Sequence, residues 1–251
     1  MVDRAAPVLT RTRALALAAT CFAVVAYATW AENLWELPLN WDIVVVGFVA
    51  LPAALALVWL ALPLVATPPK HPLLLPALAG VIAVALGLAG LDGPFQVAKL
   101  AAYAFVGLVL IWLFESLWWV TFIAFVIPWV DIWSVSAGPT KEVIERRPSI
   151  IEYVAVGTPF PGEESIIYLG PPDVIFFALF LGIAARFGLR VTLTWIAMTV
   201  LLGATLAGVV LGTVSGLPAL PAVCFGFLLP NLDLLWRDIR DAVRGDRPAA
   251  E

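Results

Sequence analysis

Residues 117–136 read LWWVTFIAFVIPWVDIWSVS, a run in which Asp131 is the only charged side chain. A helix of about 20 predominantly apolar residues spans the ~30 Å hydrocarbon core of a bilayer. An ionisable side chain within such a helix is costly to bury, and it usually marks a site of function. This stretch therefore predicts a membrane-spanning helix with a functional aspartate near one end.

The rest of the chain has the same apolar character. Of its 251 residues, 63% are hydrophobic and 13% are charged, against about 25% charged in a typical soluble domain. The apolar runs are continuous, whereas a membrane β-barrel has short alternating segments. The sequence therefore predicts an all-α, polytopic transmembrane helical bundle. The net charge of −4 gives no indication of a nucleic-acid partner, and Cys21 and Cys224 are interpreted as buried apolar residues rather than a disulfide.

About eight spans are expected. They cover residues 14–31, 43–66, 72–91, 95–114, 117–136, 166–186, 190–212 and 217–236. The domain organisation follows: N-terminal helices over 1–136, an extramembrane loop over 137–165, and a C-terminal half of three helices over 166–251. Within the loop, PTKEVIERR (139–147) is suited to a short amphipathic turn at the membrane interface.

The ionisable residues exclude several chemistries. The single histidine, His71, lies between prolines in a loop. An HExxH zinc site, which needs two histidines, is therefore excluded, and an intramembrane serine–histidine dyad is disfavoured because no predicted span contains a histidine. No metal or organic cofactor is indicated. Four acidic residues are interpreted as helix caps or as snorkelling side chains at span ends. They are Asp42, Asp92, Glu115 and Asp233.

Two aspartates and a pair of prolines are expected at the same depth in the membrane. Asp131 lies about five residues before its span ends, and Asp173 lies about seven residues after its span begins. The two spans run antiparallel, so both carboxyl groups enter from the side of the long loop. The stretch GLPALPA (216–222) opens the last span on that side, where Pro218 and Pro221 loosen the backbone. Two close carboxyl groups share a proton and can act as general base and general acid. The alternative is a pair of polar residues that hold two helices together, and the spacing alone does not decide.

Three motifs in this order resemble those of the presenilin and signal peptide peptidase family of intramembrane aspartyl proteases. VDIWSV with Asp131 is similar to the family's YD motif, LGPPD with Asp173 to its GxGD motif, and LPALP (217–221) to its PAL motif. The resemblance covers residues ~93–236, including GPFQVAKLAAY (93–103) and AGPTKEVIE (137–145). It implies a presenilin-like fold. The family has nine spans, against the eight expected here, and the span without a counterpart would be the family's first.

The chain departs from the family pattern at two motifs. Val130 stands in place of the usual tyrosine, and Pro172 in place of the second glycine of GxGD. With Pro171 before it, Pro172 is expected to impose an extended backbone on LGPPD, which either suits the site or distorts the loop before Asp173.

The resemblance implies an endopeptidase that hydrolyses peptide bonds within transmembrane segments of other membrane proteins. Asp131 and Asp173 would activate water, and the substrate cleft would be shaped by other motif residues. These are Gly170, Pro218, Ala219 and Leu220. SIIYLG (165–170) has the composition of a strand, so Ile167 and Tyr168 are expected to pair with an opened substrate segment.

The expected partners are substrate transmembrane helices and the lipid bilayer, with no nucleic acid, and the oligomeric state is left open. The expected location is a prokaryotic cell membrane, crossed several times. The sequence is also compatible with two other functions. One is an inactive relative that binds membrane helices, and the other is an ion- or proton-coupled transporter that uses the aspartates.

Overall fold

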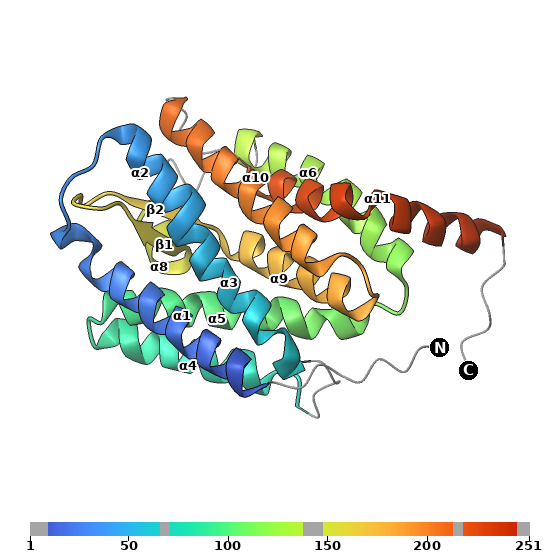
Figure 1. The fold of residues 1–251 in the computed structure, drawn as a ribbon, viewed down its shortest axis with the longest axis horizontal. Helices are drawn as coiled ribbons and strands as arrows, with labels where there is room; N and C mark the ends of the chain where they lie inside the picture. Colours follow the sequence, from blue (N-terminus) through green and yellow to red (C-terminus); the bar gives the residue numbers. More distant parts are fainter. Residues whose placement is uncertain (1–9, 66–70, 138–147, 213–217, 245–251) are drawn as a thin grey trace.

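The chain forms a bundle of helices with a short two-stranded sheet towards one end (Figure 1). The computed structural model describes residues 10–65, 71–137, 148–212 and 218–244. The helices are α1 (Arg11–Trp30), α2 (Leu39–Val45), α3 (Leu51–Ala61), α4 (Leu74–Leu88), α5 (Asp92–Leu110), α6 (Leu117–Ala137), α8 (Pro148–Val154), α9 (Pro171–Arg186), α10 (Val191–Leu211) and α11 (Leu220–Arg244). The strands are β1 (Val156–Pro159) and β2 (Ile166–Leu169). The predicted helical bundle is confirmed, with the sheet as an addition.

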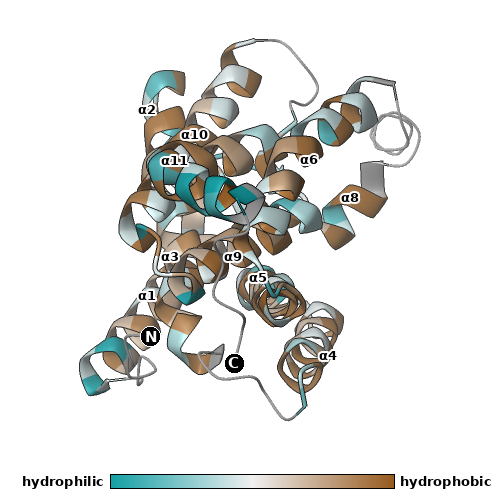
Figure 2. Ribbon diagram, turned by 90° about the vertical axis from the view of Figure 1, so that its right-hand side faces the viewer, coloured by the Kyte–Doolittle hydropathy of each residue, from teal (hydrophilic) through white to brown (hydrophobic). Residues whose placement is uncertain are grey.

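Within the described residues, five helical segments are long and apolar enough to cross a membrane. They are Arg11–Asn33, Leu39–Leu64, Asp92–Leu113, Leu117–Ser136 and Val191–Leu211. Helices α4 and α9 are shorter, with 15 and 16 residues. Helix α11 has 25 residues but ends in a hydrophilic stretch, which is teal in Figure 2. Every predicted span thus contains a helix, while five of these helices are long and apolar enough to cross a bilayer.

Helix α9 lies at the centre of the bundle. It is apolar around its whole circumference, as a helix enclosed by others must be, and it packs against α5, α10 and α11. Phe177 is fully buried, and the Phe180 ring stacks on the Phe227 ring of α11 with centroids 4.8 Å apart. A Cβ atom on Gly107 of α5 would lie 2.2 Å from the Ile175 carbonyl oxygen. Glycine at this position therefore allows α5 and α9 to approach closely.

The second predicted span is one helical segment with a wider turn inside it. A π-helical turn over Val46–Ala50 joins α2 to α3. Pro52 follows at the start of α3, where it has no N–H to donate and its ring crowds the carbonyl four residues earlier. The wider turn accommodates this defect without ending the segment.

The two strands form an antiparallel hairpin whose tip rests on the connection between α1 and α2. Val156 pairs with Leu169, and Thr158 pairs with Ile167. In the hairpin turn, Gly162 has a φ of +73°, and its N–H donates to the Ala31 carbonyl across 2.8 Å. A Cβ atom there would lie 2.5 Å from a backbone nitrogen of the connection. The tip therefore needs glycine for both its conformation and its contact.

The hairpin corrects two sequence predictions. The predicted span 166–186 is not helical from its start, because residues 166–169 form β2 and α9 begins at Pro171. The predicted loop 137–165 contains α8 and β1 in its described part, while PTKEVIERR lies outside the described residues. The strand expected within SIIYLG is confirmed over Ile166–Leu169, where β-branched and aromatic residues favour extended backbone.

Candidate active site

Asp131 lies in α6 and is bound by the first residue of α11. Helix α6 packs against α11, and the partly buried Asp131 Oδ2 accepts a hydrogen bond from the Leu220 backbone N–H across 3.1 Å. The first N–H groups of a helix have no acceptor within that helix, and they carry its positive dipole end. The last residue of the PAL motif thus binds the first aspartate of the candidate pair.

Asp173 occupies the third position of α9. Its Oδ2 accepts a hydrogen bond from the Gly170 N–H across 3.0 Å. Gly170 is the N-cap, with φ −64° and ψ 152°. This bond is the half of a capping box in which the third helical residue reaches back to the N-cap. Asp173 therefore lies in the first turn of its helix, which corrects the prediction of about seven residues into a span.

The two prolines of LGPPD fit this helix start. Pro171 and Pro172 occupy its first two positions, where a backbone N–H would find no acceptor within the helix. The N–H groups of Asp173 and Val174 both point to the Gly170 carbonyl, at 3.1 and 3.4 Å. The extended backbone expected in LGPPD is thus limited to Leu169 and Gly170, and the prolines belong to the helix.

The two aspartates lie close enough for their charges to interact. The Asp131 carboxylate acts electrostatically on Asp173, and both act on the buried thiol of Cys224, one turn into α11. Cys224 and Cys21 are both free thiols; Cys224 is buried as predicted, whereas Cys21 is only partly buried. In each aspartate one oxygen is bound by a backbone N–H. Three elements, α6, α9 and α11, thus bring two oriented carboxyl groups to one place.

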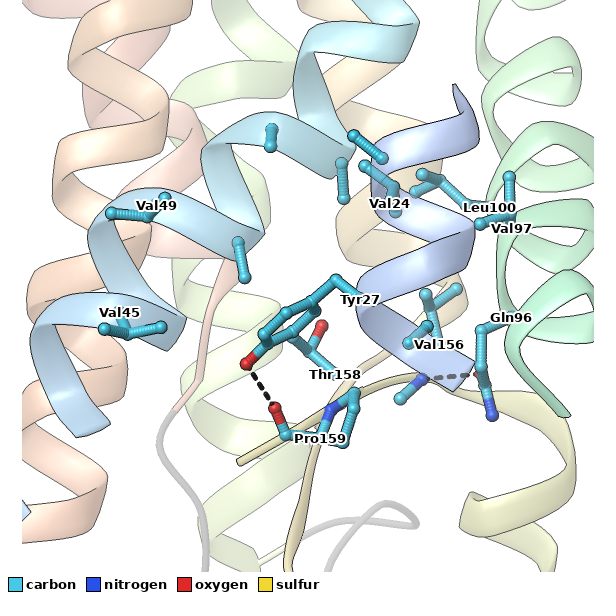
Figure 3. A pocket seen from close by; sticks show the side chains of 16 residues that line it. Val24, Tyr27, Val45, Val49, Gln96, Val97, Leu100, Val156, Thr158 and Pro159 are labelled. Carbon is cyan, nitrogen blue, oxygen red and sulfur yellow. Dashed lines mark hydrogen bonds between the residues drawn. The ribbon is translucent and has the colours of Figure 1, made fainter. Parts of the chain in front are cut away.

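A cavity lies beside β1, on the side of that strand that faces away from β2 (Figure 3). It has a volume of about 230 Å³ and is lined by mainly small apolar side chains of α1, α3, α5 and β1. The Tyr27 hydroxyl donates to the Pro159 carbonyl across 2.8 Å, and the Gln96 Oε1 accepts from the Gly157 N–H across 2.8 Å. Side chains therefore bind the Gly157 N–H and the Pro159 carbonyl, two of the backbone groups that β1 directs away from β2.

The free edge of the hairpin belongs to β2. Backbone groups of an antiparallel strand point alternately toward its partner and away from it. The backbone groups of Gly157 and Pro159 are directed away from β2. Those of Val156 and Thr158 are therefore directed toward it, opposite Leu169 and Ile167. The N–H and C=O groups of Ile166 and Tyr168 then point outward, and no other described backbone group bonds to them. By the same alternation the Gly170 N–H also points outward, and it donates to the Asp173 carboxylate. The open edge of β2 therefore ends beside a carboxyl group.

The other predicted site residues gather around a small cleft. It measures about 70 Å³, and Ile167, Tyr168 and Ala219 all line it together with residues of α3 and α10. Pro218 is partly buried just before Ala219. Leu220 and Gly170 contact the aspartates themselves. The structure therefore brings together β2, the PAL residues and both aspartates.

Sequence reasoning missed two buried ionisable residues. Lys99 is 4% exposed and Asp42 is 1% exposed, so the interpretation of Asp42 as a cap or snorkelling side chain is wrong. Asp42 Oδ1 has no hydrogen-bond partner among the described residues. Asp92 is exposed in the first turn of α5, and Asp233 forms an exposed ion pair with Arg190 at 2.6 Å. The described residues contain no group of three or more His, Cys, Asp or Glu placed to hold a metal.

Comparisons with known proteins add no relative. No protein-family model matches the chain, and neither a curated protein nor a solved structure was found to match it. The resemblance to intramembrane aspartyl proteases therefore rests on the three motifs and stays a prediction.

Proposed function

We propose that this protein is an intramembrane aspartyl endopeptidase of the presenilin-like type, which hydrolyses peptide bonds within transmembrane segments of other membrane proteins. The observation that carries the proposal is the meeting of Asp131 and Asp173 at the end of an open strand edge. Each carboxyl group is oriented by a backbone N–H, and the two interact electrostatically. A pair that only held two helices together would need no adjoining open strand.

The chemistry uses one shared proton. Two close carboxyl groups do not both ionise readily, so one is charged and the other is protonated. The charged group takes a proton from water as the water oxygen attacks the scissile carbonyl carbon, and the protonated group donates to the carbonyl oxygen. Proton transfer to the amide nitrogen then lets the C–N bond break, which leaves a new carboxyl group and a new amine. No cofactor takes part.

The open edge of β2 addresses the main obstacle to this reaction. A transmembrane helix uses its backbone groups in internal hydrogen bonds, so the guest segment must unwind before water can attack. The outward groups of Ile166 and Tyr168 offer it backbone partners in place of those lost. A guest strand on this edge runs past Gly170 toward Asp173, and Ala219 lines the adjacent cleft.

In this proposal the chain is a multi-pass protein of a lipid bilayer, with substrate transmembrane helices as its partners. The five long apolar segments support this placement. The many large apolar side chains that are exposed on the helices have the same implication, since large apolar patches mark membrane or partner contacts. Location in a prokaryotic cell membrane stays a prediction from composition.

The test uses the purified chain in detergent with a set of single-span peptides, and mass spectrometry identifies the products. The variants are Asp131→Asn and Asp173→Asn, which keep the side-chain shape, with the exposed Asp92→Asn as the matched control. We expect cleavage by the wild type and by Asp92→Asn, and none by the two site variants. A hydroxyl-bearing transition-state mimic should block the reaction.

Other outcomes contradict the proposal in different ways. Cleavage that survives either site substitution would exclude the aspartyl mechanism. Peptide binding without cleavage would indicate a non-cleaving membrane-helix binder. Aspartate-dependent ion flux into vesicles, with no cleavage of any peptide, would indicate a transporter.

A further inference from the structure

One face of α5 carries three polar side chains that bind the chain entering β1. Gln96, Lys99 and Tyr103 are spaced three and four residues apart, so they lie on the same face of the helix. Gln96 accepts from the Gly157 N–H across 2.8 Å, and the Tyr103 hydroxyl donates to the Val154 carbonyl across 2.7 Å. The end of α8 and the start of β1 are therefore tied to α5.

Lys99 makes the central contact of this face. Its ammonium donates to the carbonyls of Glu152, Tyr153 and Ala155 at 3.4, 3.3 and 2.5 Å, and lies 4.3 Å from the centroid of the Phe95 ring. Lys99 is 4% exposed, and no carboxylate of the described residues forms an ion pair with it. A buried ammonium is costly, and it is tolerated here because the last carbonyls of α8 need donors. An apolar side chain would fill the space but leave those carbonyls unpaired.

The same helix also contacts α9 beside Asp173. Gly107 of α5 lies against the Ile175 carbonyl, two residues beyond Asp173. Between Gln96 and Gly107, α5 rises about 16 Å at 1.5 Å per residue. One rigid helix therefore sets the position of the hairpin at one end and of the Asp173 turn at the other.

Resting on the proposed function, we propose that Gln96, Lys99 and Tyr103 are positioning residues that select which peptide bond of a guest strand is cut. They do not touch the guest. They fix β1 along α5, the β1–β2 pairing fixes β2, and the open edge of β2 sets the guest's register against Asp173. A guest that slips by one residue turns its side chains to the wrong face, so the favoured slip is two residues.

The experiment compares Lys99→Met with Lys99→Arg, which keeps a cationic donor. Products from one single-span peptide are mapped by mass spectrometry, and hydrogen exchange is measured over residues 154–169 in the same samples. For Lys99→Met we expect new cuts two residues from the wild-type cut and exchange about tenfold faster in the hairpin, with α10 unchanged. Lys99→Arg should keep the wild-type cut. If Lys99→Met does not fold, Tyr103→Phe removes one hydroxyl from the same face and should shift the products in the same way.

Each remaining result decides the question. Lower yield of the same products in the same proportions would overturn the positioning role, since a merely structural residue changes the amount of active protein and not the cut. If the wild type cleaves nothing, the proposed function fails separately. Hydrogen exchange then tests the α5 clamp, formed by Gln96, Lys99 and Tyr103, on its own: faster exchange confined to the hairpin supports it, and unchanged exchange overturns it.

Discussion

The Leu220 N–H and the Asp131 carboxylate, 89 positions apart in the sequence, are joined by a hydrogen bond of 3.1 Å. Asp173 has the same kind of partner in the Gly170 N–H. Both donors are backbone groups at helix starts, where no acceptor exists within the helix. The orientation of both carboxyl groups therefore depends on where α9 and α11 begin.

Replacing Leu220 with proline tests the first of these bonds. Proline fits the first position of a helix, so Leu220→Pro removes the N–H and leaves α11 able to form. A hydrogen bond to a charged group contributes about 1.5–3 kcal/mol, so kcat/KM should fall roughly 10- to 100-fold. Leu220→Ala is the control, because it loses the same buried side chain and keeps the N–H. Equal kcat/KM in the two variants, at matched thermal stability, would show that the bond is unimportant.

Replacing Gly170 with alanine tests the second bond. Its φ of −64° suits any residue, but the new Cβ would lie 3.0 Å from Asp173 Oδ2. The carboxylate has to move, and we expect about a tenfold loss of kcat/KM from this misplacement. Gly80→Ala in α4 is the control, because nothing lies within 4 Å of its Cβ position. That control should leave cleavage unchanged and stabilise the fold by about 0.5–1 kcal/mol. Equal cleavage by both alanine variants would contradict the assigned role of Gly170.

Pro172→Gly restores the GxGD pattern, and it should bring no gain in cleavage. Pro172 is exposed at the second position of α9, where it already fits the helix. Glycine enlarges the conformational freedom of the unfolded chain, so the free energy of unfolding should fall by about 1 kcal/mol. Peptide cleavage and thermal unfolding in detergent check both expectations. A large gain in kcat/KM would mean that the proline ring hinders the site.

Asn231 provides a stability test far from the aspartates. It is fully buried in α11, where it accepts from the Arg190 N–H at 2.9 Å and donates to Thr194 Oγ1 at 2.7 Å. Asn231→Leu leaves the Arg190 N–H without an acceptor and should lower the free energy of unfolding by about 1–3 kcal/mol. The control, Asp233→Asn, breaks only an exposed ion pair and should change the melting temperature much less. The reverse order of melting temperatures would contradict this expectation.

The long helices could be predicted because their signal lies in composition and length. Every predicted span contains a helix, and the strand within SIIYLG was predicted from its β-branched and aromatic residues. The start of α9 was misplaced because the apolar run continues through β2 without a change of composition. Only Gly170 and the two prolines mark the boundary, since proline at the first helical position is a common helix start.

Strand β1 could not be predicted in the same way. Its residues, Val156–Pro159, include a glycine and a proline, which disfavour strands. Its conformation depends on pairing with β2 and on distant side chains such as Tyr27 and Gln96. A signal for the α5 clamp was nevertheless present. Gln96, Lys99 and Tyr103 form a polar stripe at helical spacing within an apolar span, which indicates a buried polar partner.

The unpaired edge of β2 has a cost for the protein itself. An open strand edge is a template for any extended chain, including the same strand in another copy, and edge-to-edge pairing of this kind leads to aggregation. Two features limit that hazard. The strand is only four residues long, and Pro171 and Pro172 follow Gly170 directly, with no N–H to extend the ladder. The two prolines thus end the edge directly after Gly170, while the outward backbone groups of Ile166 and Tyr168 have no backbone partner among the described residues.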